Sequence, residues 1–139
     1  EDARLLILDE PTAGMDVMVR EQIFDLLREF MMPGDRSILI SSHISSDLEG
    51  FCDDVYLMNH GKIVLHEDVD ILLEQYGILK VTPEQYDTLD KEYLLRVKKE
   101  DYGYACLTGQ KDFYQENWPQ VIVEKGTIDQ VMTMMVEGK

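Results

Sequence analysis

The stretch LLILDEPTAG, residues 5–14, joins four aliphatic residues to two adjacent carboxylates and a proline turn. A short apolar run that ends in charge is typical of a strand buried on both faces of a parallel sheet. Asp9 and Glu10 follow at the carboxyl end of this strand, the edge at which open α/β sheets bind their ligands. The stretch therefore predicts a buried strand over residues 5–8 that presents two acidic side chains at a ligand-binding edge.

A helix and a second strand are expected to follow. Asp16 can cap the helix, whose apolar residues recur at helical spacing until Pro33-Gly34 ends the pattern. Residues 37–41, SILIS, are typical of a second buried strand. The strand–helix–strand order predicts a right-handed crossover between two parallel strands, which aligns their carboxyl ends. We therefore expect His43 at the same edge as the two carboxylates.

A change in the sequence pattern predicts a domain boundary near Gly77. Before it, residues 46–49 fit a capping box, and residues 55–67 are typical of a hairpin that turns at Asn59-His60-Gly61 and leads into a helix. After it, the pattern of short strands and helices changes. We therefore divide the chain into a first domain over residues 1–77 and a second over residues 78–139.

The second domain is expected to be a small α+β accessory domain. Helices are expected to open at Thr82, Thr108 and Thr127. Together with strands at residues 79–81, 94–97, 104–107 and 121–123, the first two helices give the order β-α-β-β-α-β. This order is the ferredoxin-like pattern. It carries no recognisable catalytic set, so a regulatory or interaction module is one interpretation of this part of the chain.

The charge of the chain limits the partners that it can bind directly. With 28 Asp and Glu against 13 Lys and Arg in 139 residues, the formal net charge is −15, which repels nucleic-acid backbones. No apolar run approaches the roughly 18 residues of a membrane span. We expect neither nucleic-acid binding nor direct membrane insertion. A nucleotide remains compatible with the charge, because local backbone amides, a lysine and magnesium hold phosphates on acidic proteins.

Two motifs together resemble those of the ATP-binding-cassette (ABC) ATPases: DEPTAGMD at residues 9–16 and SSH at residues 41–43. The resemblance implies a P-loop NTPase domain with mainly parallel strands. It implies that Asp9 ends the Walker B strand and binds magnesium through water, and that Glu10 is the catalytic base. It also implies that His43 is the switch histidine, which hydrogen-bonds the γ-phosphate of ATP.

The chemistry of phosphoryl transfer explains these residue types. In P-loop NTPases the Walker B Asp helps to hold the magnesium that bridges the β- and γ-phosphates, while a second group orients the attacking water. A general base contributes about 10²–10⁴-fold to the rate. Asp16 has two interpretations, a helix N-cap or a D-loop residue that contacts nucleotide across a dimer, and Val17 stands where the family commonly has Pro.

The loop that would hold the phosphates is missing from the sequence. No glycine begins a Gly-x-x-x-x-Gly-Lys-Ser/Thr string, and no Ser-Gly-Gly-Gln signature occurs. In ABC ATPases both motifs normally precede Walker B. The sequence also opens on Glu1 rather than Met. We therefore expect the C-terminal part of an ABC ATPase domain, followed by the accessory domain, and expect that this fragment alone is inactive.

The resemblance implies an ATP-hydrolysing subunit of an ABC transporter. Residues 52–77 resemble the hairpin and helix of bacterial exporter ATPases, which favours export. Such subunits use ATP and magnesium, pair with a second ATPase subunit, and bind a transmembrane permease at the cytoplasmic, inner face of the membrane. The alternative is a non-transport ABC ATPase of DNA repair or translation with a regulatory C-terminal module, which the acidity disfavours.

Overall fold

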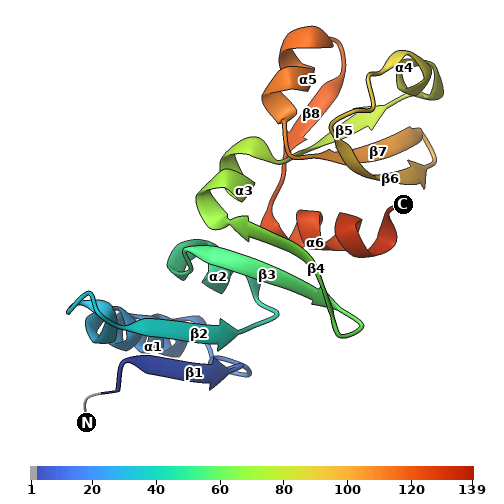
Figure 1. Cartoon of the computed structure of the whole chain (residues 1–139). Helices are drawn as coiled ribbons and strands as arrows, with labels where there is room; N and C mark the ends of the chain where they lie inside the picture. The colour runs from blue at the N-terminus through green and yellow to red at the C-terminus, as the bar shows by residue number, and fades with distance from the viewer. Residues whose placement is uncertain (1–2) are drawn as a thin grey trace. The chain divides into compact units, whose positions relative to one another are not determined.

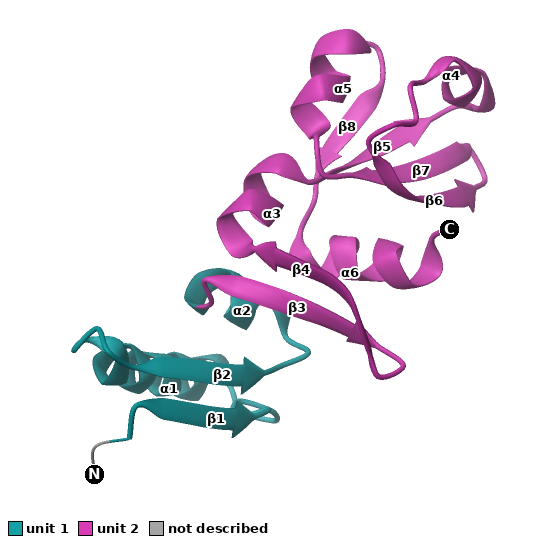
Figure 2. Cartoon of the chain, viewed as in Figure 1, with its two compact units in different colours: residues 1–51 teal, residues 52–139 magenta. Residues whose placement is uncertain are grey.

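The computed structural model describes residues 3–139. The chain divides into two compact units, Glu1–Phe51 and Cys52–Lys139 (Figure 2). The sequence places a domain boundary after Gly77 instead, and that division into domains stays a prediction. Within the described residues, no helix combines the length and the apolar composition needed to cross a bilayer.

The first unit is a strand–helix–strand crossover followed by a short helix. Its elements are β1 (Leu5–Asp9), α1 (Val17–Met31), β2 (Ser37–Ser41) and α2 (Ser45–Phe51) (Figure 1). β1 and β2 pair in parallel, in a register that runs from Leu5 opposite Ser37 to Asp9 opposite Ser41. The predicted parallel crossover is confirmed, and it brings the carboxyl ends of the two strands side by side.

One face of the β1–β2 sheet is open, which corrects the expectation of a strand buried on both faces. Alternate residues of a strand point to opposite faces. Leu6, Leu8, Ile38 and Ile40 are half-buried on one face, whereas Ile7 on the other face is 69% exposed. Phe24 of α1 is buried in this unit and contacts Phe51 of α2 with ring centroids 5.0 Å apart. The helices therefore supply the core of the unit, and the second face of its sheet is uncovered.

The second unit begins with a hairpin and a helix. β3 (Asp54–Asn59) pairs with β4 (Lys62–Asp68) in antiparallel fashion, and α3 (Val69–Gln75) follows. His60 and Gly61 form the turn with φ of 50° and 75°. Positive φ at both central residues matches the right-handed twist of the strands. The predicted hairpin at Asn59-His60-Gly61 is thus confirmed.

A four-stranded antiparallel sheet forms the rest of the second unit. Its strands lie in the order β6-β7-β5-β8. Each β-α-β crossover skips one position: β7 lies between β5 and β6, and β5 lies between β7 and β8. The β-α-β-β-α-β order is therefore confirmed. The elements are β5 (Gly77–Val81), α4 (Pro83–Thr88), β6 (Leu94–Glu100), β7 (Gly103–Thr108), α5 (Lys111–Asn117), β8 (Ile122–Lys125) and α6 (Ile128–Glu137).

Two of the three predicted helix starts in this sheet region are confirmed. Thr82 and Thr127 each form a complete capping box at the start of α4 and α6. Thr108 does not open α5, which begins at Lys111. Its hydroxyl instead donates to the Tyr93 carbonyl oxygen at 2.7 Å, so a tertiary partner competes for the residue that the sequence assigns to a cap.

The expectation of mainly parallel strands is not met. Among the strands in residues 3–139, only β1 and β2 run parallel. β3 and β4 are joined by a tight turn, which forces antiparallel pairing, because parallel strands need a long crossover between them. β5, which begins at Gly77, belongs to the antiparallel sheet. The chain is therefore a mixed α/β structure with one parallel strand pair.

Candidate functional site

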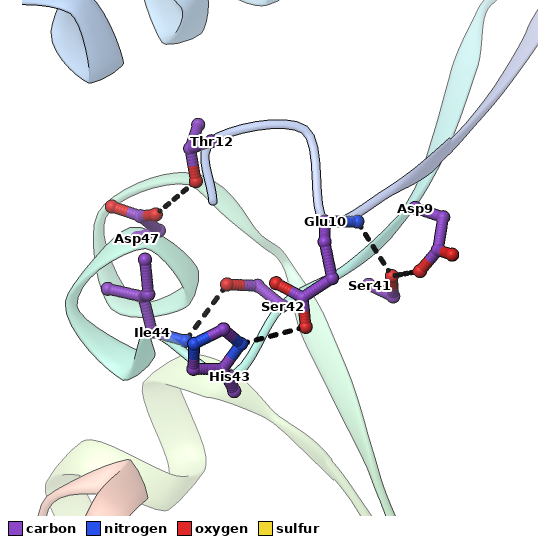
Figure 3. A network of polar contacts seen from close by, with 8 residues as sticks. All are labelled: Asp9, Glu10, Thr12, Ser41, Ser42, His43, Ile44 and Asp47. Carbon is purple, nitrogen blue, oxygen red and sulfur yellow. Dashed lines mark hydrogen bonds and ion pairs between the residues drawn. The ribbon is translucent and has the colours of Figure 1, made fainter. Parts of the chain in front are cut away.

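Ser41, at the end of β2, holds the backbone and the side chain at the end of β1. Its hydroxyl donates to Oδ1 of Asp9 and accepts a hydrogen bond from the backbone N–H of Glu10 at 3.0 Å (Figure 3). The Glu10 N–H also lies 3.1 Å from the Ser41 carbonyl oxygen. The parallel register explains this arrangement, because Asp9 and Ser41 are paired positions. The two carboxylate residues are thus fixed to the neighbouring strand.

Glu10 leaves the strand with its backbone in the left-handed region, at φ 48°. Few residues other than glycine adopt this conformation, and holding one there costs on the order of 1–3 kcal/mol. The side chain is 35% exposed, and its two oxygens differ. Oε1 contacts Nδ1 of His43 at 2.9 Å, whereas Oε2 is buried without a hydrogen-bond partner among residues 3–139. Glu10 therefore keeps one buried acceptor atom unused.

His43 follows β2 in the short segment that leads into α2. Its side chain is 73% exposed, and the hydrogen bond to Glu10, followed by the negative charge of Glu10, raises the pKa of His43. The Ile44 N–H donates to the Ser42 hydroxyl at 2.9 Å and shapes this segment. The structure brings Glu10 and His43 together, as expected from parallel strands with aligned ends. Their catalytic roles stay predictions.

Asp16 lies at the start of α1 and not at the strand ends where Glu10 and His43 meet. Its Oδ1 accepts a hydrogen bond from the Val19 N–H at 2.9 Å, which makes it the N-cap. The structure therefore shows the first of its two interpretations, and the role across a dimer stays a prediction. Both functions are compatible, because the cap uses only one carboxylate oxygen.

A buried polar network beside the site was missed by the sequence analysis. Asp47 of α2 accepts a hydrogen bond from the Thr12 hydroxyl at 2.9 Å and another from Arg20 of α1 (Figure 3 draws the first). Thr12 is 1% exposed and Asp47 is 7% exposed. The sequence places Asp47 in a capping box. Burial and tertiary pairing of a polar residue leave no spacing signal, so no sequence pattern indicates this network.

The residues at this edge fit a nucleotide-bound magnesium ion better than a metal ion held by protein alone. No group of three or more His, Cys, Asp or Glu side chains that could hold a metal occurs in the described part of the chain. Magnesium usually keeps several waters and takes one or two carboxylates together with substrate phosphates. Asp9 supplies one exposed carboxylate, and Glu10 adds a second carboxylate whose side chain is 35% exposed.

Comparisons with known proteins point to one group of transporters. No protein-family model matches the chain. A provisionally named ABC transporter ATP-binding protein of Mycoplasma pneumoniae is 32% identical over 127 residues, which cover 88% of this chain and 38% of the relative. The Nod factor export ATP-binding protein I of a Rhizobium species is 26% identical over 117 residues, 80% of this chain and 38% of the relative.

A shorter match extends the comparison. The energy-coupling factor transporter ATP-binding protein EcfA2 of Staphylococcus epidermidis is 36% identical over 63 residues, 45% of this chain and 22% of the relative. The chain thus spans less than two fifths of the length of each of these three relatives. Over most of its own length, the chain is homologous to ATP-binding proteins of ABC transporters.

Proposed function

We propose that this chain is part of the ATP-hydrolysing subunit of an ABC transporter and carries the magnesium, base and switch-histidine residues of the hydrolysis site. The observation that carries the proposal is the 2.9 Å contact between Glu10 and His43 at the aligned ends of β1 and β2. Homology to ATP-binding proteins of ABC transporters supports it. The phosphate-binding loop and the signature motif, absent from this sequence, belong to other residues of the complete protein.

The polar atoms of the edge suggest a division of labour. Asp9 would hold magnesium through water, and the ion, when bound, would supply positive charge next to the phosphates. Glu10, whose side chain is 35% exposed, takes the proton of the attacking water on its carboxylate. His43 donates from Nδ1 to Oε1 of Glu10, which fixes the carboxylate and leaves the other ring nitrogen for a phosphate oxygen.

The wider assembly follows from the same proposal. The turn at residues 13–16 contacts a second ATPase subunit, with Asp16 at the junction. A transmembrane permease binds the pair at the inner, cytoplasmic face of the membrane. Export is the direction we propose, supported by the name of the Nod factor export relative. Residues 78–139, with their ferredoxin-like order, form an accessory domain that supplies no phosphate ligand.

A matched pair of variants of the complete protein tests the hydrolysis site. Glu10→Gln keeps the shape of the side chain but cannot accept a proton, so we expect ATP turnover to fall by about 10²-fold or more with ATP binding retained. Glu21→Gln removes a carboxylate from the exposed surface of α1 and should leave turnover unchanged. Turnover of Glu10→Gln within tenfold of the parent protein would remove Glu10 from the role of base.

Purification of the complete protein from membranes tests the transport assignment. We expect a multi-span permease to co-purify with it, and we expect vesicles containing both to move a substrate outward only when ATP is supplied. Recovery with DNA or ribosomes and without a permease would contradict the assignment and favour a repair or translation ATPase.

A further inference from the structure

The network around Asp47 joins three separate segments of the first unit. Asp47 lies on α2, Thr12 lies in the turn after Glu10, and Arg20 lies in the first half of α1. The two carboxylate oxygens of Asp47 are used in different directions, Oδ2 for the Thr12 hydroxyl and Oδ1 for Nη2 of Arg20. The Asp47 side chain is therefore hydrogen-bonded both to the turn that contains Thr12 and to α1 through Arg20.

Burial makes the loss of a hydrogen-bond partner in this network energetically costly. The side chains of Asp47 and Arg20 are 6% and 20% exposed, so their charges are largely removed from water. A buried carboxylate that loses one partner retains an uncompensated charge, which is far more costly than the loss of a surface pair. In the structure both oxygens of Asp47 accept a hydrogen bond, whereas Nε of Arg20 is buried without a partner among residues 3–139.

Two residues of the network lie close in sequence to Glu10 and His43. Thr12 is two residues beyond Glu10, and Asp47 is four residues beyond His43. A link between Thr12 and Asp47 thus spans the two backbone segments whose side chains meet in the Glu10–His43 contact. The Thr12–Asp47 hydrogen bond is thus separated from the Glu10–His43 contact by only a few residues of each segment.

We propose that Asp47 is a positioning residue: through Thr12 and Arg20 it holds the turn that carries Glu10 against the segment that carries His43. The proposal rests on the function proposed above, in which these two residues act on ATP. Asp47 itself touches no reacting group in this account. Its effect on hydrolysis passes entirely through the relative placement of Glu10 and His43.

A role in stability alone gives a different expectation from a role in positioning. If Asp47 and Thr12 only stabilise the fold, a folded variant of Thr12 retains the Glu10–His43 contact. If they position the pair, the same variant loosens the contact while the fold persists. The pKa of His43, which the Glu10 contact raises, distinguishes the two cases without any measurement of ATP turnover.

The test uses Thr12→Val, which keeps the shape and removes the hydroxyl, with Thr12→Ser as the control that restores a hydroxyl. In the 139-residue chain, NMR titration should show the His43 pKa falling toward that of an ordinary exposed histidine in Thr12→Val and staying raised in Thr12→Ser. A folded Thr12→Val chain with an unchanged His43 pKa would overturn the proposal. If Thr12→Val does not fold, Thr12→Ala, which also removes the hydroxyl, provides the same titration with the same outcomes.

Kinetics of the complete protein separate this proposal from the proposed function. Thr12→Val should lower kcat by about 10- to 100-fold, the scale of a small misplacement of catalytic groups, while KM for ATP stays the same. Thr12→Ser should recover most of the loss. If the His43 pKa shifts but Glu10→Gln leaves turnover intact, positioning stands and the hydrolytic role of Glu10 fails. If Glu10→Gln abolishes turnover but Thr12→Val leaves kcat and the His43 pKa unchanged, the reverse holds.

Discussion

Nδ1 of His43 lies 2.9 Å from Oε1 of Glu10, although the two residues are 33 positions apart in the sequence. The contact exists because β1 and β2 are parallel and in register, so that both residues emerge just beyond the same edge of the sheet. Its geometry couples a carboxylate to a group that titrates near neutral pH. The pKa of His43 therefore depends on the presence of the Glu10 carboxylate.

Glu10→Gln should lower the pKa of His43 toward that of an ordinary exposed histidine. In the parent chain the hydrogen bond and the charge of Glu10 favour the imidazolium form and raise this pKa. The resulting stabilisation is present below the pKa of the unfolded state and is lost as pH rises through the folded pKa. NMR titration of the 139-residue chain measures it, with Glu21→Gln as control. An unshifted His43 in Glu10→Gln would contradict the contact.

His43→Ala should cripple ATP hydrolysis by the complete protein, because it removes both the group that orients Glu10 and the proposed contact to the γ-phosphate. His60→Asn is the matched control: it changes a histidine of the β3–β4 turn to a residue that tolerates the left-handed backbone found there. Steady-state phosphate release measures both. Normal turnover in His43→Ala would make His43 a residue of structural importance only.

Asp16→Ala should destabilise the chain by about 1 kcal/mol, because the Val19 N–H loses its capping acceptor. Asp16→Asn retains an acceptor oxygen and should be close to the parent in urea unfolding. The same two variants separate the interpretations of Asp16 in the complete protein. If Asp16→Asn is stable yet hydrolyses ATP slowly, the carboxylate acts beyond the cap; if its turnover is normal, capping accounts for the residue.

Gly103→Ala should destabilise the second unit by more than about 1 kcal/mol. A Cβ at this position would lie 2.2 Å from the Val81 carbonyl oxygen, and φ is +146°. Thermal unfolding followed by fluorescence of Trp118, which packs against Tyr114 in this unit, provides the measurement. Gly50→Ala is the control, since its Cβ would meet nothing within 4 Å. An unchanged transition in Gly103→Ala would mean that the β7 backbone shifts easily.

The 139-residue chain alone should not bind magnesium-ATP with micromolar affinity. Asp9 and Glu10 add negative charge beside an anionic triphosphate, and the sequence contains no glycine-rich loop with its lysine to reverse that field. Isothermal titration calorimetry with magnesium-ATP measures the affinity. Micromolar binding would place the phosphate site in residues that no motif indicates.

Local patterns predicted much of the fold. The apolar run before Asp9, the cap at Asp16 and the stop at Pro33-Gly34 are signals carried by neighbouring residues, and together they predicted the parallel crossover. Parallel pairing then placed His43 beside Glu10 without further information. The capping boxes of the second unit worked in the same way, because their hydrogen bonds close within a single turn of helix.

Tertiary contacts account for what the sequence could not predict. The exposure of Ile7 depends on what covers the sheet, and an apolar run looks the same whether one face or both are covered. The Thr108 hydroxyl donates a hydrogen bond to the carbonyl oxygen of Tyr93, the residue just before β6, and does not cap the helix that its spacing suggests. Asp47 has the spacing of a helix-start residue, yet its burial with Thr12 and Arg20 arises only when three segments meet.

The left-handed backbone at Glu10 sets stability and activity against each other at a single position. Glycine populates positive φ freely, so Glu10→Gly would relieve the strain of this turn at the loss of the carboxylate that the proposed reaction needs. A library selected only for heat resistance would therefore be expected to enrich glycine here and to discard hydrolysis along with the strain. Selection for turnover would retain the strained glutamate.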